Sequence, residues 1–478
     1  MCDTIVATGD VTADGVTLFA KNSDREPNEA QHLHFSPAAS HPAGARLRCT
    51  YIEIPQVERT HAVLLSKPFQ IWGAEMGVNE HGVAIGNEAI FSRVPARKKG
   101  GLLGMDLLRL GLERAATARQ AVEVITGLLE EWGQGGSGGF SHPFYYHNSY
   151  LIADPGDAWV LETVDRHWAA KQVRGVYTIS NALTLGSEWD LASADLVSYA
   201  VKQGWCKGRD DFHFGRCYSD NLYTTFAAAA YRQGCTLRSL AGKKGRLALH
   251  DALDSLRDHG EWSRSDAEVR RMLPGDLRYS RGPAASLKGR PPRPWQPDQG
   301  VLKGVTVCMH AAWGPVRINQ TTGSQISHLH PQHPTHFFTA TAAPCTSLFK
   351  PLWVDAAAAH GLPDTGPQPD GRCDPHALFW RHEELHRLTL LDYPARSALY
   401  APAREALEAE FVEKALECAP APAAERAALS AELFAAADEA EARWLEQVRQ
   451  APPAPGTARL YRAAWARFNR QAGMKVGK

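Results

Sequence analysis

Cys2 and the polar residues after the next predicted strand are the first side chains that could perform chemistry. If Met1 is removed, as is usual before a small residue, Cys2 carries both a thiol and a free α-amine. The thiolate is the nucleophile that cysteine chemistry needs, and an α-amine with a pKa of about 7.7–8.0 can accept the thiol proton at neutral pH. Nucleophile and base would then be one residue, which is the terminal-amine variant of the Ser–His arrangement.

Two predicted strands joined by a turn must position Cys2. Residues 2–8 are rich in β-forming residues, GDVTADG is rich in turn residues, and Val16 to Lys21 form a second strand. The far end of this hairpin, KNSDRE, would return beside Cys2. Lys21 would there favour the thiolate, and Asp24 could hold the terminal ammonium. The alternatives are that Cys2 is an accident and that KNSDRE is a solvated strand end.

Two asparagines lie at the ends of later predicted strands. Asn87 lies near the end of the strand over residues 82–88, and Asn181 follows the strand over residues 176–179. A side-chain amide at such a position can donate to a developing oxyanion. The commoner alternative is a turn-forming asparagine that bonds to nearby backbone.

The composition limits the class of protein. The 478 residues contain 44% hydrophobic and 22% charged residues, with 52 basic and 52 acidic side chains, as in ordinary globular proteins. We therefore expect no nucleic-acid partner. The sequence contains no apolar run of membrane-spanning length and no signal-peptide pattern, so we expect no membrane association. Nine scattered cysteines without a CxxC pair argue against a disulfide framework and against a cysteine-rich metal site. We predict a cytoplasmic protein without a metal or cofactor.

Strand patterns dominate the first part of the chain and helical patterns the last part. The predicted strands cover residues 46–55, 61–66, 71–76, 82–88, 149–153, 158–163, 168–173, 176–179, 301–310, 326–330 and 336–342. Two helices are predicted over residues 102–132 with a break at 116–117, and others over 217–242, 247–258, 375–390, 402–418, 422–449 and 457–472. The glycine-rich loop 133–143 is a lid or a plain linker. The proline-rich basic loop 281–297 is a solvated connection or a partner site.

Two histidine patterns suggest metal sites. His382, Glu383 and His386 fit HExxH on a predicted helix, which is the zinc motif of metallopeptidases. The same stretch also fits an amphipathic helix with its leucines buried. The second pattern contains the histidines at 328, 330, 333 and 336; its spacing matches no standard zinc site and prolines interrupt it. We therefore predict no metal at either place and keep the zinc metallopeptidase as an alternative.

Several sequence blocks together resemble a known family. These blocks are MCDTIVA, AKNSDRE, GVNEHGVAIGNE, SNAL, CYSDNLYTTF, INQTTGSQISHL, HFFTATAAPCTSLFKP and FWRHEELHR. They resemble, in order along the chain, the secernin and dipeptidase family of cysteine-type N-terminal-nucleophile hydrolases, which is distantly similar to penicillin acylases and bile salt hydrolases.

The resemblance implies an α+β fold, a four-layer αββα sandwich over residues 1–355 with a largely helical extension over residues 356–478. It implies hydrolysis of amide bonds in small peptides, most often dipeptides. By position, Cys2 is the nucleophile, Asp24 binds its amine, and Asn87 and Asn181 position the oxyanion and the amine. A non-enzymatic secernin-like scaffold is a further alternative, and the helical extension packs on its own sheet or on a second subunit of a homo-oligomer.

The sequence departs from the bile salt hydrolase pattern at two positions. Lys21 aligns with an arginine, so the positive charge is kept but the planar guanidinium is lost. The later catalytic arginine of those enzymes aligns near Asn221. On this alignment the thiolate would depend on Lys21 or on an unassigned residue such as Arg25.

Overall fold

Two antiparallel sheets form the centre of the molecule. The computed structural model describes residues 1–260, 296–298, 305–314, 317–452 and 457–476. The six-stranded sheet has the order β14 (Val176–Ile179), β1 (Cys2–Ala7), β2 (Thr17–Arg25), β16 (Gln320–Leu329), β17 (Thr335–Phe338) and β18 (Lys350–Leu352). The eight-stranded sheet has the order β15 (Leu191–Ala192), β13 (His167–Gln172), β12 (Ala158–Val164), β11 (His147–Ala153), β10 (Ala84–Ile90), β9 (Met76–Asn79), β8 (Val63–Pro68) and β3 (Gln31–Ser36). Two small hairpin-like pairs join β4 (Ala39–Ser40) to β7 (Arg59–Thr60) and β5 (Arg46–Arg48) to β6 (Glu53–Pro55).

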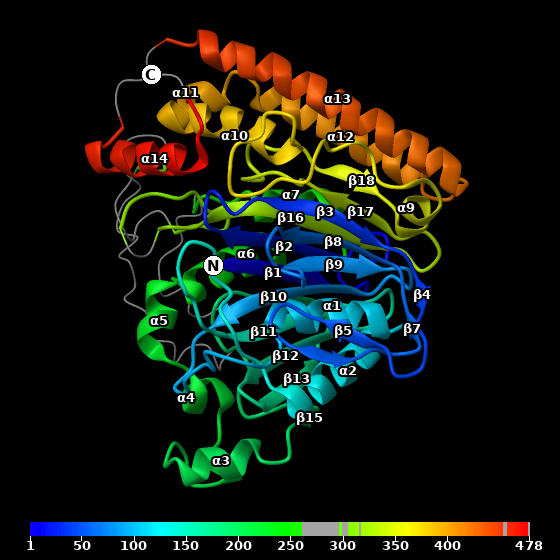
Figure 1. Cartoon of the computed structure of the whole chain (residues 1–478), viewed down its shortest axis with the longest axis vertical. Coiled ribbons are helices and arrows are strands. Elements are labelled where there is room, and N and C mark those ends of the chain that lie inside the picture. The colour runs from blue at the N-terminus through cyan, green and yellow to red at the C-terminus, as the bar shows by residue number, and fades with distance from the viewer. Residues whose placement is uncertain (261–295, 299–304, 315–316, 453–456, 477–478) are drawn as a thin grey trace.

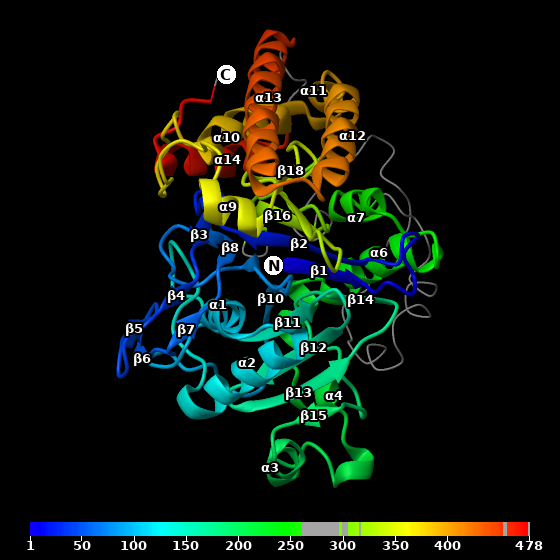
Figure 2. The same ribbon diagram turned by 90° about the vertical axis from the view of Figure 1, so that its right-hand side faces the viewer.

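The helices cover both outer faces of the sheet pair. Those of the first half are α1 (Gly104–Arg114), α2 (Ala118–Trp132), α3 (Leu196–Lys202), α4 (Phe214–Tyr218), α5 (Asn221–Phe226), α6 (Ala229–Ala241) and α7 (Leu249–Leu256). After β18 follow α9 (Val354–His360), α10 (Leu378–Thr389), α11 (Tyr393–Ser397), α12 (Ala401–Cys418), α13 (Ala423–Gln450) and α14 (Arg459–Ala472). In Figure 1, α12 and α13 lie above the six-stranded sheet, and Figure 2 shows α1 and α2 against the eight-stranded sheet. No helix within the described ranges is both long and apolar enough to span a membrane.

Three hydrophobic clusters define the layers. One joins the facing surfaces of the two sheets, for example Phe19 of β2 with Leu151 of β11. A second packs α1 and α2 against the outer face of the eight-stranded sheet. A third packs α7 and α12 against the outer face of the six-stranded sheet. The order helix, sheet, sheet, helix is the predicted αββα sandwich.

The first hairpin forms as the sequence predicts. Cys2 pairs with Ser23 across β1 and β2, and Thr4 pairs with Lys21. Because paired residues project from the same face of a sheet, Cys2, Thr4 and Lys21 share the inner face with Phe19. Asp24 follows Ser23 and projects toward the helices. The other edge of β2 pairs with β16, so the strand behind Cys2 lies inside the sheet.

Most predicted elements are present, and three strands differ. The predicted strand over 46–55 is the small pair β5 and β6, since residues 49–52 form a turn. The predicted strand over 71–76 is wrong because β9 begins at Met76. Residues 305–310 are not a strand; 301–304 and nearly all of the proline-rich loop 281–297 lie outside the described residues. The strands end at Leu352 and helices follow from Val354, while the domain boundary at residue 355 stays a prediction.

Candidate active site

Cys2 is buried at the start of β1, with only 4% of its surface exposed. Its backbone N–H donates to Oδ1 of Asn181 at 2.9 Å. The amide N–H of Asp24 donates to the Cys2 Sγ at 3.3 Å. A hydrogen bond of this kind favours the thiolate over the thiol. Asn181 therefore contacts the nitrogen of Cys2, and Asp24 contacts its sulfur.

Arg232 of α6 contacts the backbone of Cys2 directly. Its fully buried guanidinium donates to the Cys2 carbonyl oxygen at 2.7 Å, to Asp3 and to Oδ1 of Asn181. The Asn181 side chain also donates from Nδ2 to the Ala89 carbonyl at 2.7 Å. These contacts fix Oδ1 of Asn181 toward the nitrogen of Cys2. Arg232 and Asn181 thus bind the backbone of Cys2 together in a buried site.

Lys21 reaches from β2 across the space between the two sheets. Its Nζ donates to the Asn87 carbonyl oxygen at 2.6 Å and lies 3.4 Å from Oε1 of Glu88. Burial opposes its charge, but the Coulombic attraction of Cys2 and Glu88 raises the Lys21 pKa above the ordinary value. Burial raises the pKa of Glu88 to about 8 against the effect of Lys21. Lys21 is therefore a fixed cation on the sheet face that it shares with Cys2.

Asp24 lies on the opposite face of β2. Its Oδ1 accepts a hydrogen bond from Oγ1 of Thr321 at 2.7 Å, and Oδ2 is buried without a hydrogen bond from the described residues. Burial raises the Asp24 pKa to about 7, while the N-terminal ammonium and Arg232 act to lower it. The terminal N of Met1 donates to the Asp24 carbonyl oxygen at 3.3 Å. This contact is with the backbone of Asp24, and the role of its carboxylate in binding the amine of Cys2 stays a prediction.

The thiol itself is not activated while Met1 is attached. Burial raises the Cys2 pKa to about 12, and Lys21 offsets only part of this rise. The nitrogen of Cys2 is then a peptide N–H, which cannot act as a base. Within the part of the chain that the structure describes, Cys2 Sγ accepts a hydrogen bond from the Asp24 N–H and has no hydrogen bond to a general base.

The side chain of Asn87 forms hydrogen bonds with residues other than Cys2. Its carboxamide lies between Asn148, 3.1 Å away, and Glu75, whose backbone and carboxylate oxygens lie 3.0 and 3.1 Å away. Its carbonyl oxygen instead accepts from Lys21. The predicted role of Asn87 as an oxyanion donor stays a prediction.

Arg25 and Asn221 do not take the place of a catalytic arginine. Arg25 donates to Glu29 at 3.0 Å and to Glu75 at 3.1 Å, so its charge is paired there. Asn221 is exposed on α5. Arg232 is instead the buried guanidinium that contacts Cys2, and it could not be found from the sequence because it lies inside a predicted helix without a local motif. The buried face of α6 also carries Gln233, Thr236 and Arg238, so the sequence did not single out Arg232.

The glycine-rich loop lies beside this site. A small cavity is lined by Leu103, Gly104, Gly135, Gly136, Gly138, Tyr146 and Asn148. Asn148 contacts Asn87, and the hydroxyl of Tyr146 lies 3.5 Å from a guanidinium nitrogen of Arg25. The loop therefore borders a cavity whose lining residues contact Asn87 and Arg25.

The HExxH residues do not converge on one point. His382 contacts Glu441 through Nδ1 at 2.8 Å and Thr346 and Ser347 through Nε2 at 3.1 Å. His386 contacts His310 instead, at 3.2 Å between Nε2 and Nδ1. The two histidines therefore lack the shared ligand position that a catalytic zinc of this motif needs.

The αββα layers, with a cysteine at the start of an inner strand, define an N-terminal-nucleophile hydrolase fold. Residues 1–232 match the sequence model of peptidase family C69. A dipeptidase of Bifidobacterium longum (strain NCC 2705) is 29% identical over 221 residues, which cover 40% of this chain and 39% of that protein. A probable dipeptidase of Salmonella dublin is 25% identical over 243 residues, which cover 46% of this chain and 53% of that protein. The matches thus span about two fifths to one half of these relatives.

Solved structures with related architecture are more distant. Penicillin V acylase from Agrobacterium tumefaciens has a TM-score of 0.38 and 14% identity, covering 73% of this chain and 86% of its own. A variant of the conjugated bile acid hydrolase from Clostridium perfringens has a TM-score of 0.39 and 13% identity, covering 74% of this chain and 92% of its own.

Proposed function

We propose that this protein is a cysteine-type N-terminal-nucleophile hydrolase that cleaves amide bonds of small peptides, with dipeptides as substrates. The observation that carries the proposal is that hydrogen bonds hold both the nitrogen and the sulfur of Cys2. Its nitrogen contacts Asn181, and its sulfur accepts a hydrogen bond from Asp24. With Met1 still attached, the nitrogen and the sulfur of Cys2 are thereby already held in one buried, charged site. The dipeptidase names of the two relatives support the substrate class.

The proposed reaction begins after removal of Met1. The α-amine of Cys2 takes the thiol proton, and the thiolate attacks the substrate carbonyl. Asn87 and backbone N–H groups are the predicted donors to the oxyanion. The Cys2 ammonium then returns the proton to the leaving amine, which leaves a thioester. Water hydrolyses the thioester with the same amine as its base. Asn181 accepts a hydrogen bond from the amine, Asp24 is the predicted partner of its ammonium form, and Arg232 holds Asn181 in place.

The test is the chemical state of the N-terminus combined with thiol reactivity. We expect an intact mass that lacks Met1 and, after brief treatment with a thiol-reactive probe, labelling at Cys2 before the other eight cysteines. Dipeptides should then be hydrolysed, and labelled protein should be inactive. A chain without Met1 whose Cys2 is unreactive and which cleaves no dipeptide would refute the proposal.

The two alternatives predict different outcomes. A zinc metallopeptidase acting through His382, Glu383 and His386 would keep its activity after Cys2 is labelled. A secernin-like scaffold would show no hydrolysis even with a free N-terminal cysteine. The separate contacts of His382 and His386 described above argue against the first alternative.

Arg232 should be required for both the site and its stability. In Arg232→Lys an ammonium replaces the guanidinium that contacts Cys2, Asp3 and Asn181. An ammonium cannot reproduce the planar geometry of these contacts. We expect kcat/KM for dipeptides to fall roughly 10²-fold. The melting temperature should also fall, because Asp3 loses part of its buried ion pair.

The matched control is Arg238→Lys, since Arg238 is also buried on α6. We expect this variant to retain near-normal kcat/KM. Equal losses of activity in the two variants would assign Arg232 a general structural role in α6.

A further inference from the structure

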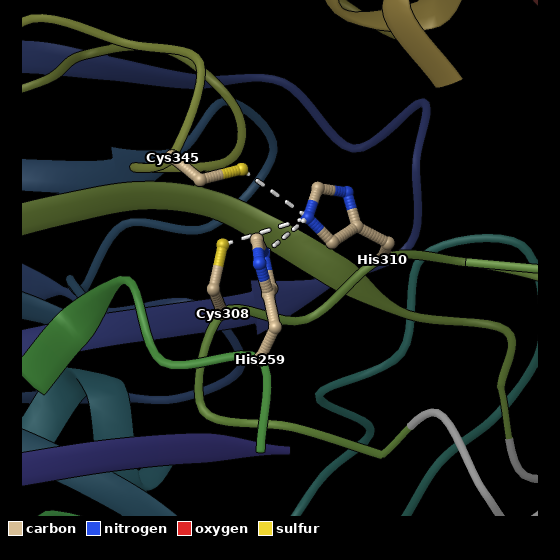
Figure 3. Close-up of side chains that lie close together, drawn as sticks. All are labelled: His259, Cys308, His310 and Cys345. Carbon is tan, nitrogen blue, oxygen red and sulfur yellow. Dashed lines mark hydrogen bonds between the residues drawn. The ribbon is translucent and has the colours of Figure 1, made fainter. Parts of the chain in front are cut away.

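Four metal-ligating side chains meet at a second buried place in the molecule. His259 follows α7, Cys308 and His310 lie in the segment before β16, and Cys345 lies in the loop between β17 and β18. One ligand atom of each lies within 4.8 Å of the others. Figure 3 shows the two sulfurs and the His259 ring directed at the same nitrogen of His310. All four residues are more than nine-tenths buried.

The separations between these atoms fit a single tetrahedral ion. Nε2 of His310 lies 3.2 Å from Nε2 of His259, 3.6 Å from Sγ of Cys308 and 3.4 Å from Sγ of Cys345. With Zn–N bonds of about 2.0–2.1 Å and Zn–S bonds of about 2.3 Å, a regular tetrahedron places two nitrogens about 3.3 Å apart and a nitrogen and a sulfur about 3.6 Å apart. The three distances to His310 are close to these edges, and all four ligand atoms lie within 4.8 Å of one another.

A second layer of contacts orients His310. Its Nδ1 lies 3.2 Å from Nε2 of His386, and Nδ1 of His386 lies 3.3 Å from Oε1 of Glu383. If Nε2 of His310 binds a metal, its Nδ1–H donates to His386, which carries its own proton toward Glu383. This carboxylate–histidine support behind a ligating histidine is common at zinc sites. Gln320 and Arg387 in turn donate to Glu383. HExxH residues thus support a ligand without being ligands themselves.

We propose that His259, Cys308, His310 and Cys345 bind one Zn²⁺ ion in a closed, structural site. Two sulfur and two nitrogen ligands in a tetrahedron are typical of structural zinc. Binding releases one proton from each thiol to solvent. Two thiolates, two neutral imidazoles and Zn²⁺ then have no net charge, which suits a buried position. Four protein ligands leave no coordination position for substrate or water.

The site would stabilise the strand that carries the active site. Asn22 of β2 donates to the carbonyl oxygens of Leu256 and Val307, at 2.8 and 3.0 Å. Each of these segments leads directly to a zinc ligand. Met309, between Cys308 and His310, donates its N–H to Oγ1 of Thr321 at 3.0 Å. The same hydroxyl donates to Asp24. Zinc would therefore fix loops that hold the face of β2 opposite Cys2.

The first experiment is metal analysis of the purified full-length chain by plasma mass spectrometry. We expect one zinc per chain, retained through dialysis, and X-ray absorption with two sulfurs at about 2.3 Å and two nitrogens at about 2.0 Å. Cys308→Ser and Cys345→Ser should lose the zinc and unfold at a lower temperature. Cys49→Ser and Cys217→Ser, which change other buried cysteines, should keep it.

Two histidine variants separate this site from a catalytic HExxH zinc. His382→Gln should keep one zinc, whereas His386→Gln should keep zinc but bind it about 10–100-fold more weakly in competition with a chromophoric chelator. The absorption spectrum of the unmodified chain remains decisive if the cysteine variants fail to fold. Well under one zinc per chain after reconstitution with zinc alone would overturn the proposal. So would loss of zinc in His382→Gln, a stoichiometric metal other than zinc, or a mass two hydrogens lower that shows a Cys308–Cys345 disulfide.

Discussion

Cys2→Ala should abolish dipeptide hydrolysis while leaving the chain folded. Alanine is also small, so Met1 removal should proceed as in the parent chain. The variant keeps an α-amine at the same place but has no nucleophile, and loss of a nucleophile of this kind lowers the rate by roughly 10³-fold or more. Removing one buried sulfur should lower the melting temperature only slightly. Steady-state hydrolysis of a dipeptide series and thermal unfolding measure the two effects.

Cys49→Ala is the matched control, because Cys49 is equally buried but packs against α1 and α2. It should retain nearly full kcat/KM. Activity of Cys2→Ala within tenfold of the parent would contradict the N-terminal-nucleophile mechanism and leave a nucleophile elsewhere in the chain.

A chain with a residue permanently attached before Cys2 should be inactive until that residue is removed. A cleavable N-terminal extension allows both states to be prepared from one batch of protein. With the extension the nitrogen of Cys2 is a peptide N–H, and burial holds the thiol pKa at about 12. Thiol labelling at Cys2 should then be slow at pH 7.5 and rise about tenfold per pH unit below that pKa. Cleavage to expose Cys2 should restore fast labelling and hydrolysis.

The control for this experiment is chemical acetylation of the exposed amine, limited to the low pH at which lysines stay protonated. It should return the cleaved enzyme to the inactive state without changing its fold. Equal activity before and after cleavage would show that the α-amine of Cys2 is not the base, even if Cys2→Ala is inactive.

The architecture could be predicted because its signals are local. The hairpin of β1 and β2 follows from alternating residues and a turn, and the break between α1 and α2 follows from the 3.6-residue period. Lys21 and Asp24 could be placed beside Cys2 because a hairpin fixes which residues face one another. The strand expected at 71–76 shows the limit: Ile71 is buried in a small cluster with Leu103 and Met105 without joining the sheet.

The remaining site residues depend on distant parts of the chain. Arg232 reaches Cys2 across 230 residues, and no sequence spacing announces such a contact. The same is true of the proposed zinc ligands, since Cys308 and Cys345 come from separate loops and form no CxxC pair. The absence of a local motif was therefore poor evidence against a metal site.

A structural zinc would also change how chelator experiments are interpreted. Loss of activity after zinc removal would not identify a metallopeptidase, because the proposed zinc supports β2 through Asn22 and Thr321. Only the combination with Cys2 labelling separates the two explanations. Zinc-loaded protein whose Cys2 is labelled should have no hydrolytic activity.

The place of β2 inside its sheet affects the chain while it is being synthesised. One neighbour of β2 is β1, but the other is β16, which ends at Leu329. Because synthesis proceeds from the N-terminus, Cys2 leaves the ribosome long before β16 has been made and can pair with β2. During this interval the nascent end is open to acetylation or oxidation. Either modification would remove the base or the nucleophile of the mechanism that we propose.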